Sequence, residues 1–110
     1  MKKNIAKIIL LILLTGCDDI CRTSGEEFRQ LQYHFVVAEK HTEDAKISVI
    51  TGKDSTGKNE KFRQVGFHKL YDAATPGDTL VKEAGKMRTY LVRKDTTLTF
   101  KYYCRGEEVY

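Results

Sequence analysis

Three cysteines carry the most reactive side chains of this 110-residue chain. Cys17 directly follows an apolar run, Cys21 comes soon after it, and Cys104 lies near the C-terminal end. A thiol can act as a nucleophile, bind a metal or form a disulfide, and its neighbours decide which of these it does. The sequence has no CxxC pair and no Cys/His cluster with metal-ligand spacing. Thioether and disulfide chemistry are therefore the leading expectations.

The segment before Cys17 has the features of an export signal. It begins with Lys2 and Lys3, continues with an aliphatic run over residues 8–14, and ends in small residues. The run is too short to cross a bilayer as a helix, which takes about 20 residues. It is also apolar on every side, which suits a buried core helix poorly. We expect residues 1–16 to be a cleaved signal peptide.

The stretch Leu14-Thr15-Gly16-Cys17 resembles the lipobox of bacterial lipoproteins. That motif has an aliphatic residue, a small or hydroxylated one, Gly or Ala, and then Cys. The resemblance implies a diacylglyceryl thioether on Cys17, cleavage before it and acylation of the new amino terminus, commonly as palmitate. Two or more acyl chains give a stable membrane anchor, whereas one gives only marginal binding. We therefore expect a protein held on the inner or outer membrane of a bacterial envelope, facing the periplasm or the cell surface.

Residues 17–27 are polar and charged, and they predict a tether between the lipid and a folded domain over residues 28–110. Asp18 and Asp19 follow the lipobox directly. In the lipoprotein family, acidic residues at this place can act as sorting signals between membranes. A solvated tether explains them equally well.

Cys21 and Cys104 remain once Cys17 is lipidated. In an oxidising compartment an even pair of cysteines predicts a disulfide. Such a bond would close a loop of about 80 residues and, in the chain-entropy description, would contribute at most roughly 4 to 4.5 kcal/mol.

The charge of the chain changes when the signal is removed. The full sequence has 19 basic and 15 acidic residues, a net charge of +4. The signal takes away Lys2, Lys3 and Lys7 and no acid, which leaves 16 basic and 15 acidic residues. A mature chain near +1 gives no support to nucleic-acid binding.

The pattern of the remaining chain indicates β-structure. Leu31, Tyr33, Phe35 and Val37 alternate with more polar residues, as in half-buried strands. A helix through Phe28, Leu31 and Phe35 is the second interpretation of this segment. Further strands are expected over residues 47–51, 62–67, 79–82, 87–93 and 97–104, with a short helix over 68–74. The sequence thus predicts a mainly β fold: a small antiparallel barrel or curled sheet of five to six strands with one short helix.

Two patterns that could bind ligands favour simpler explanations. The segment from Gly52 to Asn59 approaches a P-loop but has Asn59 where Ser or Thr is needed, so we expect a hairpin loop. His34, His41 and His68 are too scattered for a metal motif. No nucleophile has a recognisable base, and we expect no metal, no cofactor and no catalysis.

A partner surface is the remaining candidate. Tyr90 and Tyr103 are expected on the outer sides of their strands, close in sequence to Arg88, Arg93 and Arg105. Tyr and Arg are enriched where proteins bind one another. These rings could equally cover the second side of a curled sheet.

The mature chain also resembles small envelope lipoproteins of two-membrane bacteria whose activity is uncharacterised, through its Gly-Asp-Thr turn followed by a strand with Lys82. We expect a non-catalytic lipoprotein that binds a protein or another envelope component. One form of this would be an immunity-type lipoprotein that neutralises a toxin arriving in the periplasm. An accessory of an envelope complex and a small envelope hydrolase are the alternatives.

Overall fold

The computed structural model describes residues 20–110. The expected signal peptide and the lipidation site at Cys17 therefore lie outside the described residues. A helix covers residues 20–30, here called the leading helix, and eight strands and one short helix follow it. In chain order these are β1 (Tyr33–Glu43), β2 (Ile47–Lys53), β3 (Asn59–Val65), α2 (His68–Ala73), β4 (Thr79–Lys82), β5 (Thr89–Val92), β6 (Thr97–Phe100), β7 (Tyr102–Cys104) and β8 (Glu107–Val109).

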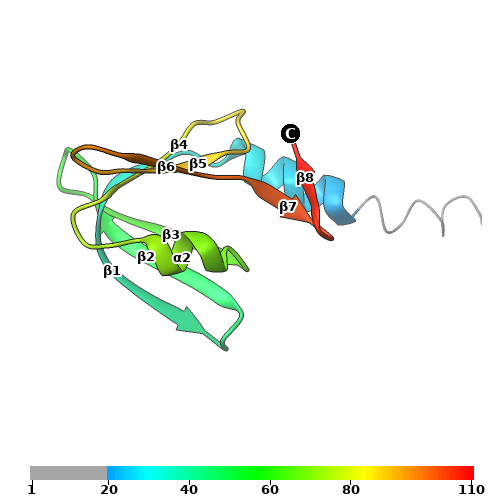
Figure 1. Ribbon diagram of the computed structural model, residues 1–110, viewed down its shortest axis with the longest axis horizontal. Coiled ribbons are helices and arrows are strands. Elements are labelled where there is room, and N and C mark those ends of the chain that lie inside the picture. The colour runs from blue at the N-terminus through cyan, green and yellow to red at the C-terminus, as the bar shows by residue number, and fades with distance from the viewer. Residues whose placement is uncertain (1–19) are drawn as a thin grey trace, which may run out of the picture.

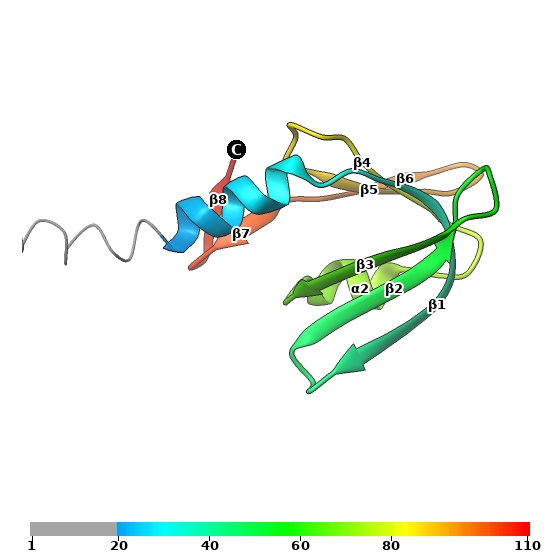
Figure 2. The same ribbon diagram turned by 180° about the vertical axis from the view of Figure 1, so that it is seen from behind.

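The fold is mainly β, as predicted, and the sheet is curled without closing into a barrel. Six strands form one antiparallel sheet in the order β3-β2-β1-β4-β5-β6, and β7 and β8 form a separate hairpin. The sheet rolls so that β4, β5 and β6 lie over β2 and β3 (Figures 1 and 2), and α2 packs against β2. The leading helix packs beside the β7–β8 hairpin at one end of the roll.

The roll turns on β1, which belongs to both layers. Its first residues pair with β4, and its later residues pair with β2. The two layers meet at Val36, which pairs with Lys53 of β2 on one side and with Thr79 of β4 on the other. A bulge follows between Val37 and Glu39, and such a bulge bends and twists a strand locally.

Gly52 allows the strands to come close at this bend. A Cβ atom at Gly52 would lie 1.8 Å from the carbonyl oxygen of Val36 and 2.8 Å from the Phe35 ring. Only a residue without a side chain fits there. Gly52 is thus a strand residue required by the roll, while the hairpin loop begins after it at Asp54, whose carboxylate accepts hydrogen bonds from Thr56 and Lys58.

The core fills the space inside the roll. Phe35 and Leu80 from one part of the sheet meet Ile50 and Phe62 from the other, and Leu70 of α2 packs between them. The predicted alternation is confirmed in β1, where Phe35 and Val37 are buried and Val36 is exposed. The predicted first strand was too short, because β1 continues to Glu43 as the partner of β2.

The two ends of the domain also differ from the sequence-based expectation. Residues 20–27, expected as a tether, belong to the leading helix, in which Gly25 and Phe28 are buried against the domain. The expected single strand over residues 97–104 is interrupted at Lys101, and its two parts belong to different sheets. Its faces were assigned correctly, since Leu98, Phe100, Tyr102 and Cys104 are all partly buried.

Two glycine-to-alanine substitutions should have opposite effects on stability. Gly52→Ala places a methyl group against the backbone of β1, and we expect it to lower the free energy of unfolding by at least about 2 kcal/mol. Gly25→Ala adds a methyl group at ordinary contact distance, 3.7 Å from Met87 and 3.8 Å from Val109. Because alanine also favours a helix, this variant should gain about 0.5 to 1 kcal/mol. Urea denaturation followed by circular dichroism measures both, and equal effects of the two variants would contradict the role given to Gly52.

Candidate binding cleft

An open cleft of about 890 Å³ lies at the end of the roll where the leading helix meets the sheet. Two continuous segments border it: residues 64–70, which connect β3 to α2, and residues 99–104, which run from β6 into β7. The third wall is one face of the leading helix and the residue after it, namely Ser24, Glu27, Phe28 and Leu31. Their spacing of three and four residues is that of neighbouring positions on a helix.

A cluster of aromatic rings lies at the inner part of the cleft; Phe28, Phe67 and Tyr102 border the cleft, and Phe62 is buried behind them. The Phe67 ring centroid lies 5.1 Å from that of Phe28, 5.2 Å from that of Phe62 and 5.9 Å from that of Tyr102. Phe28 and Tyr102 are stacked with their centroids 4.9 Å apart. These rings come from the leading helix, β3, the β3–α2 connection and β7, so the cluster joins all three walls of the cleft. Such rings offer a large apolar contact surface with fixed geometry.

Phe67 occupies a strained backbone position in the cleft wall. Its φ angle is 59°, in the left-handed region that residues with a side chain rarely adopt, and Gly66 before it has a φ of 81°. The turn is held by Ser48, whose hydroxyl donates to the Gly66 carbonyl at 2.5 Å, and by the Gly66 amide, which donates to Lys46. Strain of this kind costs of order 1–3 kcal/mol and is concentrated at functional sites. Here it directs the Phe67 ring into the aromatic cluster.

Lys82 fixes the leading helix behind the cleft. Its side chain is fully buried, and Nζ donates hydrogen bonds to the carbonyls of Arg29 at 3.0 Å, Leu31 at 2.7 Å and Glu83 at 3.1 Å. Nζ also lies 4.8 Å from the centre of the Phe28 ring. A cation at this place satisfies carbonyls at the C-terminal end of a helix and complements the helix dipole. Burial, with a smaller contribution from the Arg29 charge, lowers the pKa of Lys82 to about 8.

A disulfide joins Cys21 to Cys104, as the sequence predicted. It connects the leading helix to β7, and its Cα atoms lie 5.9 Å apart. Cys104 itself borders the cleft. The two cysteines are 83 residues apart in sequence, and a loop of this size corresponds to a stabilisation of about 4.5 kcal/mol at most. Two walls of the cleft are therefore linked covalently.

The rim of the cleft carries charged and polar groups. His68 and Lys69 are exposed on α2, Lys101 is exposed at the junction of β6 and β7, and Glu27 stands on the leading helix. Lys101 forms an ion pair with Glu108 at 3.6 Å. Burial raises the pKa of Tyr102, and the Glu27 carboxylate raises it further, so this phenol is neutral at physiological pH.

The five residues predicted as a partner surface are divided between different places. Tyr103 borders the cleft, whereas Arg88 and Tyr90 line a second hollow next to β8. Arg88 pairs with Glu108 at 3.6 Å. Arg105 lies in the tight turn between β7 and β8, with a φ of 55°.

Arg93 has a structural role at the other end of β5. Its guanidinium donates to both carboxylate oxygens of Asp78, at 2.9 and 3.1 Å, and to the carbonyl of Ala73 at the end of α2. The Asp78 carboxylate also accepts the Thr75 amide, which fixes the turn before β4. The Asp78 contact raises the pKa of Arg93. The structure therefore does not bring Arg88, Tyr90, Arg93, Tyr103 and Arg105 together in one surface.

The cleft itself was missed by the sequence analysis, because its walls come from three segments that are far apart in the sequence. The burial of Lys82, in contrast, could have been predicted from the strand pattern. In the strand Thr79–Lys82 it has the same parity as the buried Leu80, which places a lysine on the inner face.

The three histidines stay apart, and no group of three or more His, Cys, Asp or Glu residues in 20–110 is placed to hold a metal ion. Over the same residues, no helix is long and apolar enough to cross a membrane. No protein-family model, curated protein or solved structure matches the chain.

Replacing Lys82 should reveal how strongly it holds the leading helix. Lys82→Met removes the donor from three carbonyls, and we expect a loss of about 2 kcal/mol at pH 7. In the folded protein the Lys82 pKa is about 8, below its ordinary value of 10.5. Between these values the unfolded chain binds the extra proton, so this group makes stability rise with pH. The wild type should therefore gain stability over Lys82→Met between pH 8 and pH 10.

The matched control is Lys40, an exposed lysine that donates to the carbonyls of Tyr71 and Asp72 at the end of α2. Lys40→Met should cost less than about 1 kcal/mol, since water can replace its hydrogen bonds. Raised tyrosine pKa values at Tyr33 and Tyr102 lower stability above pH 10 in every variant alike. Urea titrations at pH 7, 8, 9 and 10 measure these differences. A pH-independent difference between wild type and Lys82→Met would contradict the assignment.

Proposed function

We propose that this chain is a lipid-anchored protein of the bacterial envelope that acts by binding a protein or another envelope component, without catalysis. The cleft is the observation that carries the binding role. Its volume of about 890 Å³ lies in the range of ligand-binding pockets, and an apolar interior with a few polar groups at the rim is their usual composition.

The architecture around the cleft supports a binding role. The Cys21–Cys104 disulfide, the buried Lys82 and the aromatic cluster hold its walls together. A site held in place in this way loses little conformational freedom when a partner binds, and that favours affinity. The polar residues at the rim are positioned to orient a partner.

Two sequence features support the location. The Leu14-Thr15-Gly16-Cys17 stretch resembles a lipobox, and a disulfide is typical of proteins outside the cytoplasm. Together they suggest a domain that begins almost directly at the lipid. The described part of the leading helix begins three positions after Cys17, so the proposed anchor would hold the domain close to the membrane surface.

The anchor can be tested by the intact mass of the protein purified from membranes of a two-membrane host. We expect a chain that begins at Cys17 and carries a diacylglyceryl group, with or without a further acyl chain. Cys17→Ser should retain residues 1–16 and carry no lipid. A processed wild-type chain with a free Cys17 thiol would contradict the proposed anchor.

The binding role needs a separate measurement on the same lipidated chain. A photo-crosslinking residue at Lys69, on the rim of the cleft, should give a discrete crosslinked product in intact envelopes. The control position is Lys94, in the turn between β5 and β6 and away from the cleft. Equal crosslinking at both positions, or no product at Lys69, would contradict binding at the cleft.

A further inference from the structure

One edge of the rolled sheet runs unpaired along the cleft. The strand order leaves β3 and β6 at the two ends of the six-stranded sheet, and β7 pairs only with β8 among residues 20–110. An unpaired strand edge presents a row of backbone N–H and C=O groups to a neighbouring chain.

The unpaired edges of β6 and β7 form a single line. Phe100 pairs with Thr89 of β5, and Tyr102 pairs with Val109 of β8. Glu108 contacts both Arg88, just before β5, and Lys101. These contacts indicate that β8 continues β5 along the same side of β6 and β7. On the other side of β6 and β7, no strand of residues 20–110 is paired with them.

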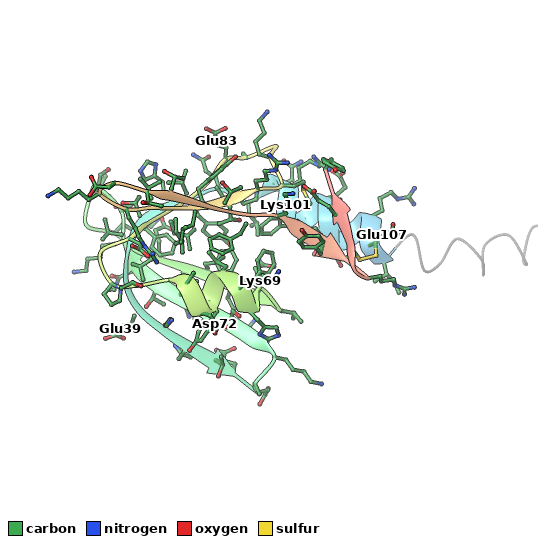
Figure 3. All side chains as sticks on the ribbon, in the orientation of Figure 1. Glu39, Lys69, Asp72, Glu83, Lys101 and Glu107 are labelled. Atoms are coloured by element: carbon green, nitrogen blue, oxygen red, sulfur yellow. A yellow bond between two sulfur atoms is a disulfide. The ribbon has the colours of Figure 1, made fainter. Side chains whose placement is uncertain are left out.

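The cleft follows this edge. All six residues from 99 to 104 border it. Side chains alternate between the two faces of a strand, so a hollow under one face would be lined by every second residue only. Contact with consecutive residues places the cleft beside the backbone edge. On its opposite side lie the Phe67 ring and the exposed residues His68 and Lys69 (Figure 3 labels Lys69 and Lys101).

The two edges of the sheet differ in how well they are protected. The β3 edge contains Glu60, Lys61 and Arg63, and charges of this kind discourage pairing with another strand. The β6 strand has the sequence Thr-Leu-Thr-Phe, with no charge and high β-propensity. Only Lys101 interrupts the line before β7, and its charge is paired with Glu108.

We propose that the partner presents an extended, acidic and apolar peptide segment that pairs with the β6–β7 edge as an additional strand. Backbone hydrogen bonds would run along residues 97–104, and alternate apolar side chains would enter the cleft against Phe67 and Tyr102. An acidic side chain of the segment would face Lys69, which forms no ion pair with any other residue of 20–110. Recognition by an added strand combines backbone hydrogen bonds for affinity with side-chain pockets for specificity. The inference rests on the proposed binding function and specifies its mode.

The test uses the disulfide-bonded protein and a defined probe, an alternating Val-Thr heptapeptide with Glu at both ends. Amide chemical shifts and hydrogen exchange are recorded by NMR at peptide concentrations up to roughly 1 mM, a range that detects weak binding. We expect residues 97–104 to shift and to gain protection, while residues 59–65 do not. The same peptide with alternate amides N-methylated should not bind.

A charge reversal provides the matched control on the protein. Lys69→Glu should weaken binding of the acidic peptide several-fold, and Lys94→Glu should leave it unchanged. Shifts confined to residues 64–70 and 24–31, without protection of the edge amides, would overturn the strand-addition mode and keep binding at the cleft. Absence of any binding would overturn the proposed segment. Edge protection without peptide, together with dimerisation in ultracentrifugation, would identify a second copy of the chain as the occupant and also overturn the proposal.

Discussion

The buried ammonium group of Lys82 joins the leading helix to the sheet, and the rest of the architecture depends on this connection. It donates to carbonyls of Arg29 and Leu31 from a strand in the middle of the roll. A buried cation is tolerated only where hydrogen bonds replace its lost hydration. The helix end supplies these acceptors, and the cation in turn caps the helix. With the helix in this position, Phe28 completes the aromatic cluster and Cys21 meets Cys104.

The second constraint is the bend in β1, because it determines where the unpaired edges of the sheet lie. Because Gly52 lets β2 approach Val36, the sheet rolls instead of lying flat. The roll does not close, so β3 and β6 remain as edge strands. The two strands differ in their charge. The β3 edge carries three charged residues, whereas the β6–β7 edge borders the cleft with an uncharged strand and aromatic rings. The bend, the open edge and the cleft are therefore parts of one arrangement.

Local patterns in the sequence predicted much of this fold. Alternation located β1 and β4, and the Thr-Pro-Gly-Asp segment located the turn before β4, where Gly77 has a φ of 97°. The Cys21–Cys104 pairing followed from counting thiols. The leading helix was missed because residues 20–27 are mostly polar and its apolar contacts are few, with Gly25 and Phe28 contributing most of them. The cleft could not be predicted, because it depends on distances between segments that only the roll brings together.

Native-state hydrogen exchange at the amides of residues 24–30 tests most directly whether the leading helix is part of the folded domain. If Lys82 and the disulfide hold the helix as described, its amides should open only with global unfolding, with the same dependence on urea as the amides of Leu80 and Leu91. Exchange of the helical amides that is much faster and independent of urea would mean that the helix detaches from a folded sheet. That result would contradict a preformed cleft.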